Sequence, residues 1–298
     1  MNRNAVRILS AVLLLLLLDF SFFPRDAVSG QKSFLWKVRS KTTTVYLLGS
    51  VHFLKKEAYP LERKIEDAFE KSDVLAVEAD ITDATKLDIG KLLGSAFYQG
   101  DETLEKHVSR ETYELIKKEL GASGLPFEFF ERQRPWFLAL TLTSVELLKL
   151  GFDPDYGIDR HFLTKAQGRK KITELESLDY QLDLLSGLSD ADQEMFLLYT
   201  VKDLKNLGRQ TDEILRSWRS GDTGGLEAAM TQGVTGDRRM SSFYDKLIYE
   251  RNRNMTSKIE GYLGSKESVF VVVGAGHLVG SRGIVELLRA KGYAIEQL

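Results

Sequence analysis

Two segments near opposite ends of the chain run from an apolar strand into the same pattern, Gly-x-x-His. Residues 45–52 are VYLLGSVH, and residues 271–277 are VVVGAGH. The whole chain has only 4 histidines, so chance is a poor explanation for the repetition. Imidazole carries protons and binds metals near neutral pH. The repetition therefore predicts that His52 and His277 share one site.

A carboxylate follows a third apolar segment. Residues 74–77 are VLAV, and Glu78 and Asp80 come next in the sequence VEAD. In an open α/β sheet, the loops after parallel strands meet at one edge, where ligands bind. Two imidazoles and a carboxylate at that edge could bind a divalent metal or position a water without metal. The pattern does not choose between Glu78 and Asp80, because either could instead cap the next helix.

Apolar periodicity predicts the elements that carry these residues. Residues 41–48 predict a strand, residues 60–72 a helix and residues 74–77 a second strand, which together form a β-α-β unit. The C-terminal part repeats the plan with a strand, a helix and a strand, at residues 269–273, 283–290 and 293–297. We therefore predict an α/β fold with a mixed, largely parallel central sheet built from both chain ends.

The middle of the chain, from about residue 104 to residue 263, predicts a large helical insertion. Its segments ETYELIKKEL, FLALTLTSVELLKL and LDLLSGLS carry apolar residues at intervals of three and four. Residues 170–175 (KKITEL) predict one further strand inside it. No Pro- or Ser-rich linker and no repeat interrupts residues 31–298, so we predict a single α/β domain with an insertion.

The first thirty residues differ from the rest. Arg3 and Arg7 precede residues 8–18, which are apolar except for Ser10. This run is shorter than the about 20 residues that span a bilayer, but it suits a secretory signal peptide. We therefore predict an exported protein, periplasmic or extracellular, with cleavage near Gly30. An uncleaved N-terminal anchor is the alternative.

Composition excludes several classes of function. The chain has 41 basic and 43 acidic residues, and this near balance gives no general attraction to nucleic acid or to acidic membranes. It has no cysteine, which excludes disulfides, a lipoprotein anchor and thiolate metal sites. Any bound metal must therefore be held by His, Asp or Glu.

Two other features receive a structural interpretation. His107 and His161 lie in charged helical segments, and we interpret both as surface or structural residues. The sequence GAGHLVG at residues 274–280 is faintly similar to a dinucleotide-binding loop, with Glu296 at a suitable distance. A Rossmann domain needs several more strands after that loop, whereas the sequence ends at Leu298. We therefore set the dinucleotide interpretation aside.

The two Gly-x-x-His segments resemble the paired GxxH motifs of the TraB/PrgY/GumN family, which includes the TIKI metalloproteases. Other parts of that family's pattern follow in order along nearly all of the chain after residue 30: VEAD, Pro135-Trp136, Gly157-Ile-Asp159, Leu175-Glu176 followed by Gln181, and Glu250-Arg-Asn-x-x-Met255. The resemblance implies an α/β fold similar to that of erythromycin-esterase-like and haem-binding ChaN-like proteins. It also implies a hydrolytic site.

Residue by residue, the resemblance implies five site residues: His52, Glu78, Arg251, Asn252 and His277. Three of them would be the ligands of a divalent metal ion (Mn, Co or Zn), namely His52, Glu78 and His277. Arg251 has no acidic residue three or four positions away on its predicted helix. Its guanidinium is therefore expected to orient Glu78 or to polarise a substrate carbonyl.

Three further residues of the pattern have weaker implications. Asp159 is a weaker site candidate, because an aspartate near a helix start is most often a cap. Glu176 and Gln181 are expected to support the fold or to line the cleft.

The expected function is that of an exported, metal-dependent hydrolase, most simply a peptidase. The metal would lower the pKa of a bound water toward ~7, and a free carboxylate or imidazole would take the proton. The chain has no HExxH motif, so the zincin assignment of ligands and base does not apply. The alternative is a non-catalytic protein that binds and sequesters a peptide or haem. The expected partner is a peptide or protein substrate, with no nucleic acid, and with a membrane only through an uncleaved N-terminal segment.

Overall fold

The computed structural model describes residues 32–232 and 238–298, so the predicted signal peptide lies outside the described residues. Two compact units make up the described chain. The sheet unit comprises residues 32–82, Gly151–Ser177 and the described part of Gly208–Leu298, and the helical unit comprises Asp83–Leu150 and Leu178–Leu207. Each predicted site residue belongs to the sheet unit.

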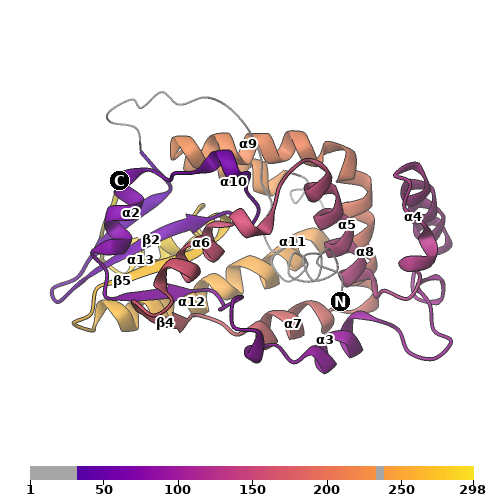
Figure 1. Ribbon diagram of the computed structural model, residues 1–298, viewed down its shortest axis with the longest axis horizontal. Helices are drawn as coiled ribbons and strands as arrows, with labels where there is room; N and C mark the ends of the chain where they lie inside the picture. The colour runs from indigo at the N-terminus through magenta and orange to yellow at the C-terminus, as the bar shows by residue number, and fades with distance from the viewer. Residues whose placement is uncertain (1–31, 233–237) are drawn as a thin grey trace. The chain divides into compact units, whose positions relative to one another are not determined.

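One six-stranded sheet forms the centre of the sheet unit (Figure 1). Its strands are β1 (Leu35–Arg39), β2 (Thr44–Ser50), β3 (Val74–Val77), β4 (Lys171–Glu174), β5 (Val269–Gly274) and β6 (Ala294–Gln297). Their order across the sheet is β4-β3-β5-β2-β1-β6. The four strands β4, β3, β5 and β2 are parallel, whereas β1 is antiparallel to both of its neighbours. The predicted mixed, largely parallel sheet built from both chain ends is confirmed.

The central strands are buried on both faces. Every residue of β3 and β5 is buried, as is every residue of β2 after Thr44. Parallel strands covered by helices on both faces are continuous apolar runs, which is why VLAV and VFVVV are recognisable in the sequence. The sequence analysis did not predict β1, in which Lys37 interrupts a short run of apolar residues.

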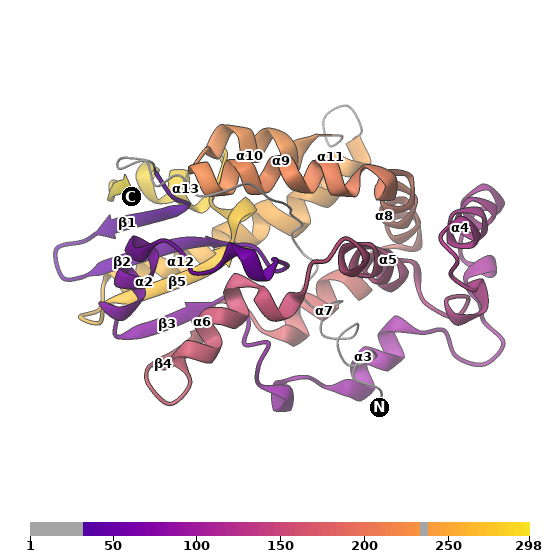
Figure 2. The ribbon, with the colours of Figure 1, turned by 45° about the horizontal axis from the view of Figure 1, so that its top comes forward.

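Helices cover this sheet. The helices of the sheet unit are α2 (Arg63–Glu70), α6 (Ile158–Ala166), α9 (Leu207–Ser220), α10 (Thr223–Thr231), α11 (Arg238–Tyr244), a π-helix (Asp245–Glu250), α12 (Arg251–Leu263) and α13 (Ile284–Ala290). α6 packs against β3, β4 and β5, and α12 packs against β2 and α13 (Figure 2). The starts of α6 and α12 hold the groups that face the predicted histidines.

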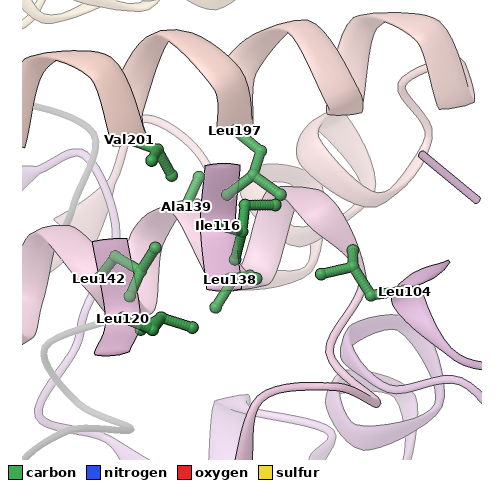
Figure 3. Close-up of a cluster of buried hydrophobic side chains, with 8 residues drawn as sticks. All are labelled: Leu104, Ile116, Leu120, Leu138, Ala139, Leu142, Leu197 and Val201. Carbon is green, nitrogen blue, oxygen red and sulfur yellow. The ribbon is translucent and has the colours of Figure 1, made fainter. Parts of the chain in front are cut away.

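A separate apolar core holds the helical unit together. The longer helices of this unit are α3 (Ile89–Ala96), α4 (Arg110–Ala122), α5 (Pro135–Lys149), α7 (Leu178–Ser186) and α8 (Asp190–Asp203). Figure 3 shows the buried cluster, which consists of Leu104, Ile116, Leu120, Leu138, Ala139, Leu142, Leu197 and Val201. All eight side chains are apolar, so this core stabilises the fold and offers no group for chemistry.

The interior of α5 also contains hydroxyl groups. Thr141, Thr143 and Ser144 are buried, and each hydroxyl donates to the carbonyl four residues earlier.

Among the described residues, no helix combines the length and the apolar character needed to cross a membrane.

Candidate active site

The two Gly-x-x-His segments follow neighbouring strands. β2 and β5 are parallel, and their register pairs Ser50 with Gly274. The chain then continues to His52 in one segment and, through a short 3-10 turn (Ala275–His277), to His277 in the other. Both histidines are therefore carried at the same edge of the sheet, as the strand pattern predicted.

The first glycine of each segment is not required by its backbone conformation. No positive φ occurs at Gly49 or Gly274, and Gly274 has a φ of −49°. At Gly49, a Cβ would lie 2.5 Å from Cδ1 of Phe34 and 3.1 Å from Cα of Ala275. Gly49 is thus needed for close packing between β2 and the second motif. Its carbonyl accepts a hydrogen bond of 2.7 Å from the indole N–H of Trp218.

Glu78 links the sheet edge to the second motif. Its Oε1 accepts a hydrogen bond of 2.5 Å from the backbone N–H of Gly274 and lies 3.7 Å from Nε2 of His277. Asp80 has a different role, because its Oδ1 accepts from the backbone N–H and the hydroxyl of Thr82. Glu78 contacts Gly274 and His277 of the second motif, so the geometry favours Glu78.

Arg251 joins Glu78 to a second buried carboxylate. Its Nη2 donates to Oε2 of Glu78 (2.6 Å) and to Oε2 of Glu176 (2.7 Å), and its Nε donates to Oε1 of Glu176 (2.9 Å). Nη1 donates to the carbonyl of Leu247 in the π-helix that leads into α12. The side chain of Arg251 is 0% exposed. The guanidinium is thus directed at carboxylates and at the backbone, which leaves it suited to orient Glu78.

Each histidine ring is held through Nδ1. Nδ1 of His52 lies 2.5 Å from Oδ2 of Asp159, and Nδ1 of His277 lies 2.6 Å from Oδ1 of Asn252. The amide of Asn252 is oriented by the hydrogen bond of 2.9 Å from its Nδ2 to the carbonyl of Arg282. Since an ionised carboxylate and an amide oxygen only accept, both rings carry their proton on Nδ1. This leaves Nε2 of each ring for chemistry.

Burial and charge act differently on the two rings. Burial favours the neutral form of His52, but the carboxylates of Asp159 and Glu78 outweigh it and raise the pKa of this imidazole. For His277, burial dominates, and Arg251 and His52 add to it, so that its pKa falls to about 3 despite the nearby Glu78. The same edge of the sheet therefore carries one imidazole that favours protonation and one that remains neutral.

Glu78 stays ionised. Burial alone would raise the pKa of its carboxyl group, but the guanidinium of Arg251, the imidazole of His52 and the N–H of Gly274 lower it to about 2. Burial likewise disfavours the charged guanidinium, yet Glu78 and Glu176 raise the pKa of Arg251 above its ordinary value. A buried carboxylate with such a low pKa is typical of active sites and of structural ion-pair networks alike.

The site has some properties of a metal centre but not all of them. Nε2 of His277 is buried, has no hydrogen-bond partner among the described residues and faces a carboxylate oxygen, which suits a cation or a water. Histidine ligands of metals commonly have the other ring nitrogen bonded to an oxygen acceptor, as both rings do here. However, the described part of the chain contains no group of three or more His, Cys, Asp or Glu side chains that could hold a metal ion. The donor types fit a metal, although the described residues do not bring three of them into one group.

The remaining candidates of the sequence analysis have other roles or lie elsewhere. Nε2 of His107 contacts Glu102 (3.0 Å) at the surface of the helical unit, and Nε2 of His161 contacts Glu66 (3.1 Å) on α2. Gln181 is buried on α7 in the helical unit. The sequence analysis undervalued Asp159 and Glu176, the partners of His52 and Arg251. Their membership of the family pattern was the only sequence signal for either.

The chain belongs to the TraB/PrgY/gumN family, whose sequence pattern matches residues 34–297. The uncharacterized protein YbaP of Escherichia coli (strain K12) is 25% identical over 245 residues, which cover 82% of this chain and 87% of YbaP. The metalloprotease TIKI1 of Xenopus tropicalis is 22% identical over an alignment 315 positions long, which covers 88% of this chain and 61% of that protein. The metalloprotease TIKI2 of Danio rerio is 22% identical over an alignment of the same length, which covers 89% of this chain and 60% of that protein.

These relatives limit what the likeness implies. The chain spans about three fifths of the length of the two TIKI proteins. No solved structure matches the chain. The expected likeness to erythromycin-esterase-like and ChaN-like folds therefore stays a prediction.

Proposed function

We propose that this member of the TraB/PrgY/gumN family is an exported, metal-dependent hydrolase that cleaves peptide bonds. The observation that carries the proposal is the environment of Glu78. Its carboxylate is bonded to Gly274 of the second motif and to Arg251, and it lies beside His277. A buried ionised carboxylate among imidazoles at the carboxyl edge of a parallel sheet suits hydrolysis. The name metalloprotease of the TIKI relatives supports the reaction class.

In this proposal His52 handles the proton of the attacking water. Its Nδ1–H is bonded to Asp159, so Nε2 is the nitrogen that accepts the proton and later returns it to the leaving amine. Arg251 acts through Glu78, whose charge and orientation it maintains, because its N–H groups point to Glu78, Glu176 and the carbonyl of Leu247. Asn252 acts through His277, whose ring it holds by Nδ1.

Dependence on a metal ion is a separate part of the proposal. Its support comes from the names of the TIKI relatives and from the unpartnered Nε2 of His277 beside Glu78. Glu78 and His277 would be ligands. His52, the third ligand that the resemblance implies, could join them only if another group took the proton of the water, because Asp159 holds Nδ1 and Nε2 is the nitrogen that remains. A bound divalent ion would lower the pKa of a water toward ~7 and polarise the scissile carbonyl. Because the described residues do not form a three-ligand group, metal dependence needs its own test.

Digestion of a peptide mixture by the purified protein, followed by mass spectrometry of the new termini, tests the reaction class. We expect products from the wild-type protein, and a loss of at least about 100-fold in the His52→Ala variant. His107→Ala is the matched control, since His107 also contacts a carboxylate, Glu102, but at the surface. It should retain full turnover.

Removal of metal gives the second arm of the experiment. Chelation should abolish turnover, and Mn, Co or Zn should restore it. If the protein instead binds a peptide or haem stoichiometrically and forms no product, the non-catalytic alternative replaces the hydrolase proposal.

A further inference from the structure

The segment Gly157, Ile158 and Asp159 meets the first Gly-x-x-His segment at three consecutive positions. A Cβ on Gly157 would overlap the carbonyl oxygen of His52, so glycine is required there. The backbone N–H of Ile158 donates to the carbonyl of Val51 (3.0 Å). The Oδ2 of Asp159 accepts from Nδ1 of His52 (2.5 Å). The start of α6 is therefore fitted to both the backbone and the ring of one histidine.

Asp159 does not act as a helix cap. The N-cap position of α6 is Gly157, which makes no side-chain cap hydrogen bond, and Asp159 lies in the first turn of the helix. Its side chain is 7% exposed. A buried carboxylate is costly unless it is paired, and the imidazole of His52 is a partner at hydrogen-bond distance. The usual structural role of an aspartate near a helix start thus does not account for this one.

A second histidine in the same unit provides a comparison. His277 is also held by Nδ1, but its partner is the carboxamide of Asn252. Both partners accept the Nδ1 proton, and only that of His52 carries a full negative charge. A charge-assisted hydrogen bond is shorter and about twice as strong as a neutral one, so the orientation of His52 is the more firmly fixed.

We infer that Asp159 is a positioning residue for His52. It holds the ring with the proton on Nδ1, so that Nε2 is the nitrogen left for the reacting water. Gly157 and Ile158 place Asp159 by fitting the start of α6 against residues 51 and 52. What Nε2 does rests on the proposed hydrolase function, whereas the ring orientation rests on the contacts alone.

NMR of the histidine ring protons tests the orientation without a substrate. The wild-type protein should show a downfield, exchange-protected Nδ1 proton for His52, assigned by its absence in His52→Ala. In Asp159→Asn and Asp159→Ala this proton should move upfield or disappear, while that of His277 stays. Asp155→Asn is the matched control, because Asp155 lies shortly before Asp159 in the chain, is exposed and pairs with Arg160 instead of a histidine. A wild-type His52 without an Nδ1 proton, or an unchanged resonance in Asp159→Asn, would overturn the inference.

Kinetics of the same variants test the consequence for the reaction. The kcat of Asp159→Asn should fall about 10–100-fold, the usual effect of removing the group that orients a histidine ligand, with KM changed by less than about twofold. A merely structural role would lower the melting temperature and leave kcat per folded molecule unchanged. If the wild-type protein cleaves no peptide, the hydrolase proposal fails, and the ring-proton experiment still decides the role of Asp159.

Discussion

The two Gly-x-x-His segments leave neighbouring parallel strands, and each ends in a different environment. His52 is 6% exposed and bonded to a carboxylate, and its pKa is raised. His277 is 0% exposed and bonded to a carboxamide, and its pKa is lowered to about 3. The same motif thus presents two imidazoles, one that favours the protonated form and one that favours the neutral form. The motif determines where a ring lies, and a residue distant in sequence determines its chemistry.

The largest expected loss of stability follows from replacing Arg251, which pairs with both Glu78 and Glu176. Arg251→Ala removes the guanidinium that pairs with the buried carboxylates of Glu78 and Glu176, and removal of one partner of a buried ion pair typically costs about 3–5 kcal/mol. We therefore expect a loss of that size in the free energy of unfolding, measured by chemical denaturation at pH 7. Arg209→Ala is the control: it removes an exposed pair with Glu213 and should cost less than about 1 kcal/mol. Equal losses for both variants would mean that the buried cluster is not the network described.

The pH dependence of stability should separate the two histidines. His277 has a folded-state pKa of about 3, below the ordinary value of 6.5, so the stability from its neutral ring is present above pH 6.5 and is lost as the pH falls toward 3. For His52 the sign is reversed, because its pKa is raised. Its contribution is present below pH 6.5 and is lost as the pH rises through the folded-state value.

Unfolding of the wild type and of His277→Gln at pH 7 and pH 5 measures this difference. Between these pH values the wild type should lose about 2 kcal/mol more than the variant, since one pKa unit corresponds to about 1.4 kcal/mol. Parallel changes in the two proteins would show that His277 is not buried as a neutral ring.

The smallest expected effect concerns the packing between the two segments. Gly49→Ala would place a Cβ 2.5 Å from Phe34 and 3.1 Å from the backbone of Ala275. Overpacking of this kind costs about 1–3 kcal/mol. At Gly261 in α12 a Cβ meets no atom within 4 Å, so Gly261→Ala should raise stability by about 0.5–1 kcal/mol. Thermal unfolding of both variants checks the opposite signs, and a neutral Gly49→Ala would contradict the close approach.

Local pattern was enough to predict the buried parallel strands and the sheet edge at which the two histidines lie, but not β1. The predicted strand at residues 74–77 matches β3, and those at residues 41–48 and 269–273 overlap β2 and β5. Buried parallel strands have apolar sequences of their own, so no knowledge of their neighbours is needed. The sheet and its carboxyl edge could therefore be placed from sequence.

Partners distant in the chain could not be chosen in the same way. The contact of His52 with Asp159 joins residues 107 positions apart, and that of Arg251 with Glu176 joins residues 75 positions apart. Tertiary packing selects such pairs, and neither carboxylate differs in its local sequence from a cap or a surface residue. The close packing at Gly49 was missed for the same reason, because Phe34 and Ala275 meet it only in the folded chain.

The central claim is that His52 and His277 act in one site, and a double-mutant cycle tests it most directly. Turnover and unfolding midpoint are measured on the wild type, His52→Ala, His277→Ala and the double variant. Because catalytic groups that act as a unit are non-additive, each single change should remove most turnover, and the double change should add little to the worse one. Turnover that is unchanged by either substitution, with losses of midpoint that add as they do for independent sites, would contradict the claim.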